Sequence, residues 1–370
     1  MRSTIPSPKP SLKPSFMPTL MPSICLLALA LTLLVVLMGA YTRLTDAGLG
    51  CPDWPGCYGF NAVPKSDLAQ QLAISRFPDK PLDIVKASNE MLHRYAAASL
   101  GVLILILALC SLRPRYQRYR LGAWVLLGLV LVQGSLGMLT VTLNLLPFIV
   151  LGHLLGGMTI LALLFLLWRR ARPERYGYRQ QQRYSEPQPR RRYLRPFWLL
   201  TLWSLTLLAL VIQIALGGWT AANYAALACV ELPVCQGDWL SQWQWSAFHP
   251  HGMPADTYQY GVLSAAERVT IHVAHRLWAL VTVTMLLSLA WRCIQVRELQ
   301  PWGVWLVLAV ILQLSLGVAN VWWHLPLPLA VAHNGGAAWL LLVVTGIGEE
   351  LWRVREPVCR ETQSLSLIGQ

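Results

Sequence analysis

Charged residues are scarce in this chain, and acidic residues are the scarcest of them. Only 13% of the 370 residues are charged and 55% are hydrophobic, and 30 basic residues stand against 17 acidic ones. So little charge excludes an ordinary soluble domain and indicates a polytopic membrane protein.

Long apolar runs make up much of the chain. Roughly 20 apolar residues are needed to cross the hydrocarbon layer of a bilayer. Eight runs of that kind are found, at 23–43, 91–112, 121–143, 148–168, 197–219, 269–291, 301–323 and 328–348. We therefore expect an all-α integral membrane protein with eight transmembrane helices.

Acids are nearly absent from the segments that precede or join alternate spans. Residues 1–22 hold three basic residues and no acid, and residues 169–196 hold ten arginines against Glu174 and Glu186. An excess of Lys and Arg marks cytoplasmic segments, so both termini are expected in the cytoplasm of a cell (inner) membrane protein. The arginine run lies between spans, which favours a topology signal over a nucleic-acid site, and we expect no nucleic-acid partner.

The cysteines divide between the two faces of the predicted membrane. The two long outer loops hold two pairs with five intervening residues each, and the other cysteines are single and lie at or inside the cytoplasmic face. This distribution is expected if the outer compartment is oxidising. We predict two short disulfides, Cys51–Cys57 and Cys229–Cys235.

The two halves of the chain resemble each other. Cys51 aligns with Cys229 at an offset of 178, and His153 aligns with His333 at an offset of 180. A repeat with an even number of spans keeps its orientation, so a pseudo-two-fold axis along the membrane normal follows. We expect two tandem pseudo-symmetric four-helix bundles. The predicted divisions are a tail at 1–22, a first half at 23–168, a basic linker at 169–196, a second half at 197–348 and a tail at 349–370.

Four histidines open the second, fourth, sixth and eighth spans, near one face of the membrane. They are His93, His153, His275 and His333. An ionisable residue inside a membrane is costly and is functional by default. Two facing helices with one His each suit the axial ligation of haem iron. Zinc is the weaker alternative, because no Cys or carboxylate clearly completes a tetrahedral set. For any one His alone, a capped or hydrogen-bonded interfacial residue is the better reading.

The halves differ one helical turn before the first histidine. Glu90 precedes His93 by three residues, whereas His272 precedes His275. A carboxylate beside an iron ligand can move protons or stabilise positive charge. The alternative is an ordinary acid at a helix N-terminus, favoured by the dipole.

Three smaller features each keep two interpretations. The outer cysteine pairs are structural staples or redox-active thiols. The arginines that follow two of the histidines, Arg94 and Arg276, pair with haem propionates or anchor the helix at the interface. The glycine pairs 156–157 and 335–336 admit a flat ring or pack helices closely.

Together these residues resemble the haem A synthase family over roughly 25–345. The resemblance rests on Thr42-Arg43-Leu44-Thr45, Gly48-Leu49, Cys51-Pro-Asp-Trp54, Glu90-Met-Leu-His93-Arg94, Gly152-His153, Gln213-Ile-Ala-Leu-Gly217-Gly218, His275-Arg276 and His333-Asn334-Gly335-Gly336. It implies oxidation of the C8 methyl of haem O to a formyl group by two successive hydroxylations, for terminal oxidase maturation. The extra arginines of 169–196 and His272 are not explained by it.

The resemblance also implies roles for the candidate residues. Substrate haem O would lie between His93 and His153, and a haem b between His275 and His333. Glu90 would be the catalytic carboxylate, and the outer-loop pair Cys51 and Cys57 would be linked to activity. The implied partners are a membrane electron donor, haem O synthase and the terminal oxidase assembly, with the haem sites toward the outer face.

Two other functions fit the histidines. A di-haem cytochrome b-like electron carrier would use the same four ligands, but it has little need of Glu90. A haem-handling assembly factor or transporter is disfavoured, because no ionisable set marks the cytoplasmic half of the spans.

Overall fold

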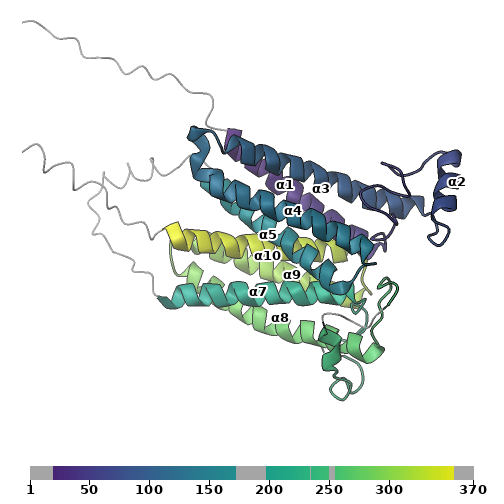
Figure 1. Cartoon of the computed structure of the whole chain (residues 1–370). Helices are drawn as coiled ribbons and strands as arrows, with labels where there is room; N and C mark the ends of the chain where they lie inside the picture. The colour runs from purple at the N-terminus through teal and green to yellow at the C-terminus, as the bar shows by residue number, and fades with distance from the viewer. Residues whose placement is uncertain (1–19, 172–196, 234, 250–254, 354–370) are drawn as a thin grey trace, which may run out of the picture.

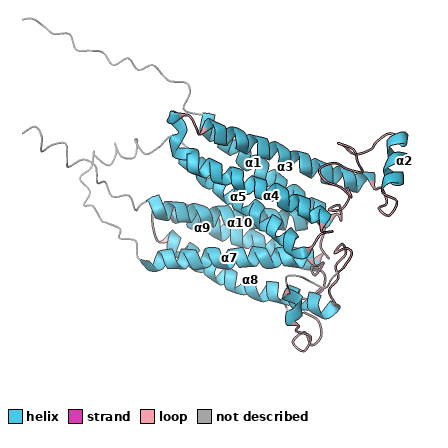
Figure 2. Cartoon of the chain, viewed as in Figure 1, coloured by secondary structure: helices cyan, strands magenta, loops and turns pink. Residues whose placement is uncertain are grey.

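The computed structural model describes residues 20–171, 197–233, 235–249 and 255–353. Within these ranges the chain is almost entirely helical, with no named strand, and eight helices are long and apolar enough to cross a membrane (Figures 1 and 2). Both the helical fold class and the eight predicted spans are confirmed. The expected tails and the basic linker lie almost wholly outside the described residues.

The spanning helices begin and end within a few residues of the predicted runs, except that two of them extend further into the outer loops. Their bounds are α1 Leu20–Leu44, α3 Ile84–Cys110, α4 Arg120–Thr142, α5 Pro147–Ala171, α7 Phe197–Ala222, α8 Ala265–Ile294, α9 Gln300–Trp322 and α10 Leu327–Arg353. The remaining elements are short: α2 Asp67–Arg76, η1 Pro114–Tyr119 and η2 Trp245–Phe248.

The two helices that extend furthest into the outer loops, α3 and α8, begin at polar caps. Asp83 accepts hydrogen bonds from the backbone N–H groups of Val85 and Lys86. Ser264 and Glu267 form a reciprocal capping box at the start of α8. Such caps satisfy backbone donors that the first helical turn leaves free. They add a polar turn or two before the apolar run, which a hydropathy pattern does not count.

Contacts between helices follow the same pattern in each half. In the first half α1 and α4 both pack on α3 and α5; in the second, α7 and α9 both pack on α8 and α10. Across the halves α1 packs on α10, α5 on α7, and α5 on α10. Exchanging each helix for its sequence counterpart leaves these contacts unchanged, which is the pattern that a two-fold relation produces.

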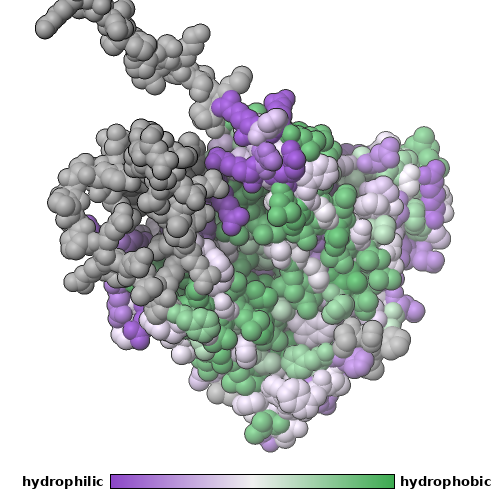
Figure 3. All heavy atoms as spheres, turned by 60° about the vertical axis from the view of Figure 1, so that its left-hand side comes forward, coloured by the Kyte–Doolittle hydropathy of each residue, from purple (hydrophilic) through white to green (hydrophobic). Residues whose placement is uncertain are grey.

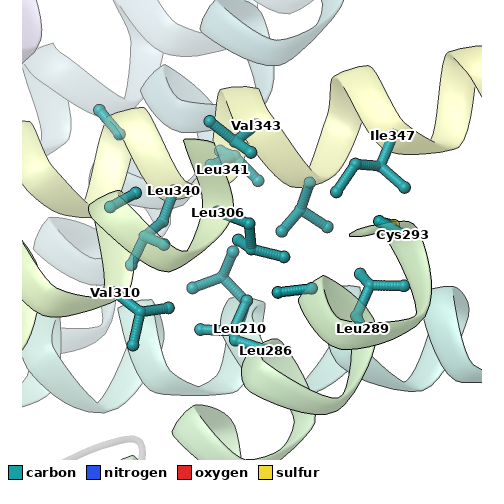
Figure 4. Close-up of a cluster of buried hydrophobic side chains, with 14 of the residues drawn as sticks. Leu210, Leu286, Leu289, Cys293, Leu306, Val310, Leu340, Leu341, Val343 and Ile347 are labelled. Atoms are coloured by element: carbon teal, nitrogen blue, oxygen red, sulfur yellow. The ribbon is translucent and has the colours of Figure 1, made fainter. Parts of the chain in front are cut away.

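A large apolar cluster fills the second half and extends across to α5. Leu210, Leu286, Leu306 and Leu341 come from four different helices and point toward one another (Figure 4). The outward faces are apolar too: one face shows hydrophobic side chains over the helices and hydrophilic ones at the margins (Figure 3). Apolar residues inside and outside are expected of a bundle whose solvent is lipid.

The long loops gather at one end of the bundle. The loop that carries α2 and the loop that precedes α8 lie together, opposite the first residues of α1 and the last residues of α10 (Figure 1). There Arg43 donates to the carbonyls of Ala221 and Ala222 at the end of α7, and its guanidinium lies 4.0 Å from the centroid of the Tyr224 ring. A residue of the first half thus caps a helix of the second.

At the opposite end, an ion pair joins α5 to α10. Arg169 binds the carboxylates of Glu349 and Glu350, and its guanidinium lies 4.7 Å from the centroid of the Trp302 ring. Arg169 and Glu349 occupy equivalent positions of the repeat, since their numbers differ by 180. Opposite charges at equivalent positions hold the two halves together where like charges would repel.

Replacing Arg169 with Ala is expected to destabilise the protein. Glu349 is only 4% exposed, and removing the partner of a buried charge costs about 3–5 kcal/mol. The apparent melting temperature in detergent, followed by tryptophan fluorescence, should fall clearly. Arg170→Ala is the matched control, because Arg170 is exposed. Equal shifts for the two variants would show that this ion pair contributes no stability.

Candidate functional site

The four predicted histidines lie in the part of the bundle nearest the long loops. His93 is on α3, His153 on α5, His275 on α8 and His333 on α10. The ring centroids of His93 and His153 are 6.4 Å apart, with an angle of 76° between the ring planes. The structure therefore brings the first predicted pair together from two helices that are distant in the sequence.

The spacing of this pair suits one metal ion between two imidazoles. A histidine nitrogen binds a metal at roughly 2.0–2.1 Å, so two rings on opposite sides of one ion have centroids roughly 6 Å apart. No group of three or more His, Cys, Asp or Glu side chains able to hold a metal is found among the described residues. The donor set therefore fits the axial ligation of a haem, whose porphyrin supplies the other four ligands.

Each histidine ring rests against a glycine of the preceding spanning helix. A Cβ built on that glycine would come within 3.4 Å of the ring in all four cases. The pairs are Gly39 with His93, Gly137 with His153, Gly217 with His275, and Gly317 with His333. A side chain at Gly39, Gly217 or Gly317 would push its ring by a few tenths of an ångström, and at Gly137 it would be in contact with the ring. These glycines therefore let the imidazoles lie close against the preceding helix.

Three glutamines stand one helical turn before three of these glycines. Gln133 donates from Nε2 to the His153 carbonyl at 2.8 Å, and Gln313 donates to the His333 carbonyl at 3.1 Å. Gln213 lies 3.2 Å from the Nδ1 atom of the His275 ring. Sequence analysis named only Gln213, as part of the family resemblance, and gave none of the three glutamines a role in the site. The signal that could have identified them is the spacing Gln-x-x-x-Gly, which occurs in three of the four helices.

The buried polar atoms around these glutamines are incompletely satisfied. The Oε1 atoms of Gln133, Gln213 and Gln313 have no hydrogen-bond partner, and neither do the Nδ1 atoms of His153 and His333. Buried polar groups are normally paired. Unpaired imidazole nitrogens on these rings fit a site at which the rings bind a metal.

The glycines that follow two of the histidines make room for glutamine side chains. A Cβ at Gly156 would meet Gln133 at 2.7 Å, and one at Gly336 would meet Gln313 at 2.1 Å. Their neighbours Gly157 and Gly335 face α1. The interpretation that these glycines admit a flat ring stays a prediction.

The carboxylate of Glu90 is buried between α3 and the first disulfide loop. Glu90 is 4% exposed, accepts a hydrogen bond from the Cys51 N–H at 2.8 Å, and pairs with Arg94. The loop approaches closely at Gly50, where a Cβ would lie 2.5 Å from the Lys86 backbone. Glu90 therefore has a fixed position, one helical turn from His93.

Both predicted disulfides are present. Cys51–Cys57 closes the loop over α3, and Cys229–Cys235 closes its counterpart in the second half. Arg94 donates to the carbonyls of three residues in the first of these loops, and Arg276 donates to the Cys229 and Glu231 carbonyls of the second. The bonds of both arginines thus go to the disulfide loops.

Tyr58 anchors the same loop beside Glu90. Its hydroxyl donates to the Pro81 carbonyl at 2.9 Å, and burial raises the pKa of that hydroxyl, with the carboxylates of Asp83, Glu90 and Asp53 adding to the rise. The phenol therefore stays neutral and keeps donating across the working pH range.

The second half has imidazole where the first has a carboxylate. His272 is 5% exposed, and its buried Nδ1 atom has no hydrogen-bond partner. His324 follows the end of α9 and His249 follows η2, so both are loop residues. His251 lies outside the described residues.

Comparison with known proteins gives one family and a consistent set of relatives. Residues 23–345 match the COX15-CtaA family, described as cytochrome oxidase assembly protein. The chain is 46% identical over 327 residues to the heme A synthase of Shewanella oneidensis, covering 88% of this chain and 95% of that one. It is 26% identical over 355 residues to the heme A synthase of Caulobacter vibrioides, covering 89% and 94%. With that of Symbiobacterium thermophilum it shares 25% identity over 343 residues, covering 91% and 96%.

Proposed function

The chain belongs to the COX15-CtaA family of cytochrome oxidase assembly proteins, and from that premise we propose which of its residues hold haem and which take part in the oxidation. The protein is a multi-pass membrane oxidoreductase of haem A biosynthesis, and it oxidises the C8 methyl of haem O to the formyl group of haem A for terminal oxidase maturation. The assignments that follow are proposals about this chain's own residues.

The first half, 23–168, is the substrate half. Haem O lies between His93 and His153, with Glu90 one turn from the first ligand. The observation that carries this assignment is the pair of rings 6.4 Å apart beside a buried carboxylate that is fixed by two donors. A residue three positions before a helical ligand shares its face of the helix, so Glu90 and His93 border the same side of the site.

The second half, 197–348, holds a haem b between His275 and His333. That group supplies one-electron transfer when it is bound. No carboxylate stands beside it, because His272 occupies the position of Glu90. The asymmetry assigns the chemistry to the first half and electron supply to the second. Its electrons would come from a membrane electron donor.

The disulfide loop has a positioning role in this proposal. Cys51 places its backbone N–H on Glu90, and Arg94 binds both the carboxylate and the loop carbonyls. Cys51 and Cys57 therefore act on the reaction by holding the carboxylate still and by covering the site from water, and they need not exchange electrons. The pair at Cys229 and Cys235 covers the haem b half.

Conversion of supplied haem O tests the proposal directly. The purified protein in detergent is given haem O, a reductant and air, and the pigments are extracted and separated. Haem A and its hydroxylated intermediate should accumulate with time. Haem that is bound and recovered unaltered would instead favour the di-haem electron carrier or the haem-handling factor.

A further inference from the structure

The four places where a histidine ring rests against a glycine of the preceding helix, called seats below, are not equivalent. In three of them a glutamine stands four residues before the seating glycine, at 133, 213 and 313. In the fourth, that position before Gly39 is Val35, which has no side-chain donor or acceptor. The histidine that rests on Gly39 is His93, the one beside Glu90.

The ring of His93 is also oriented differently. In the other three seats the ring atom nearest to the glycine is Cε1, at 3.2–3.4 Å. For His93 it is Nε2, at 3.2 Å from the Cβ position of Gly39. A nitrogen able to bind metal therefore faces the backbone of α1. The ring of His93 thus turns a nitrogen toward α1, where the other three rings turn a carbon toward the helix they rest on.

The glutamines supply what a bound imidazole needs. A histidine that ligates a metal through one nitrogen usually donates its other N–H to an acceptor, which fixes the tautomer and the ring orientation. The unpartnered Oε1 atoms of Gln133 and Gln313 are side-chain acceptors of this kind, on glutamines that already bind the backbone carbonyls of His153 and His333. Val35 offers the ring of His93 only a main-chain carbonyl.

We propose that His93 is the exchangeable axial ligand and that His153, His275 and His333 are held ligands. This inference rests on the proposed function. A haem with two fixed histidines has no position for a small molecule such as dioxygen. Release of His93 toward α1, where its Nε2 already lies against Gly39, would open that position on the side that Glu90 borders. The held pair in the second half keeps its haem closed, which suits electron transfer.

Carbon monoxide binding to the reduced protein, loaded with haem in both halves, measures this exchange. In the wild-type protein, CO should bind the haem of the first half and leave that of the second unchanged in its absorption spectrum. Val35→Gln should weaken CO binding by about tenfold, the upper range for one added net hydrogen bond. Val35→Leu is the matched control, since it adds bulk without an acceptor, and its CO affinity should stay near the wild-type value.

A second variant, which removes a glutamine instead of adding one, tests the inference even if Val35→Gln does not fold. Gln313→Val removes the acceptor from a held ligand, and the second haem should then begin to bind CO. If the methyl of Ala96 blocks the new glutamine, Val35→Gln with Ala96→Gly gives it the room that Gly156 gives Gln133. Gly336 already leaves room beside Gln313, so Gln313→Val needs no second substitution.

The outcomes separate this inference from the proposed function. Equal CO affinity of the wild-type, Val35→Gln and Val35→Leu proteins at full haem content would overturn it, and so would CO binding to the second haem alone. Where Val35→Gln lowers haem content, Gln313→Val decides: gain of CO binding supports the inference and no gain overturns it. If the first half of the wild-type protein binds no haem, the proposed function fails, and pigment content measured before CO is added shows this.

Discussion

Replacing Glu90 with Gln is expected to abolish the conversion of haem O while leaving the haem content unchanged. The amide of the new glutamine still accepts a hydrogen bond from the Cys51 N–H, and the side chain keeps nearly the shape of glutamate. It cannot take up a proton or balance positive charge. A positioned proton-transfer group contributes about 10²–10⁴-fold to rate, so product formation should fall by at least about a hundredfold. Pigment extraction after a timed incubation measures it.

Glu90 also holds the loop, so the loop needs its own control. Asp53→Asn is suitable, because Asp53 accepts hydrogen bonds from the Tyr58 and Gly59 N–H groups and lies in the same loop without contacting a proposed ligand. It should lower activity by a few-fold at most. If Asp53→Asn lost as much activity as Glu90→Gln, the carboxylate would be a loop anchor only. Near-normal conversion by Glu90→Gln would remove its catalytic role altogether.

The same result separates the enzyme from an electron carrier. A carrier with two bis-histidine haems would tolerate Glu90→Gln, because neither ligand is touched. The repeat makes the point within one chain, because His272 stands at the equivalent position before His275. A carboxylate retained in one half alone points to chemistry in that half.

Most of the fold could be read from the sequence, because a membrane span has a simple physical requirement. A run of roughly 20 apolar residues has few other uses, so all eight spans were found. The cysteine pairs were found for a similar reason, since five intervening residues in one outer loop leave few alternative partners. The histidines were found because an imidazole inside an apolar run is conspicuous.

The contacts that side chains make with other helices and loops could not be predicted from the sequence. Arg94 and Arg276 bind loop carbonyls, and nothing in their spacing distinguishes a carbonyl from a propionate as partner. Glycines at 39, 137, 217 and 317 read as ordinary small residues until the rings that rest on them are known. The glutamines were visible only as landmarks, because their contacts cross from one helix to the next.

Replacing His275 with Gly is expected to empty the second half and stop turnover. The variant keeps His333, but one imidazole ligand binds haem far less tightly than two. Haem content should fall to about half, and conversion of haem O should fall to background, because the first half then receives no electrons through the second. Haem content by pigment extraction and conversion under the same conditions measure both effects.

Free imidazole provides the control for this variant. His275→Gly leaves a space against Gly217. A Cβ built on Gly217 would lie 3.2 Å from the native ring. Free imidazole, which has the same shape as the missing ring, can enter this space. Adding imidazole should restore haem binding, and conversion should return with it. A misfolded protein would not recover, so recovery shows that the missing ligand, and not the fold, caused the loss. Two haems and full conversion in His275→Gly without imidazole would refute this ligand assignment, because the second half would then hold its haem by other residues.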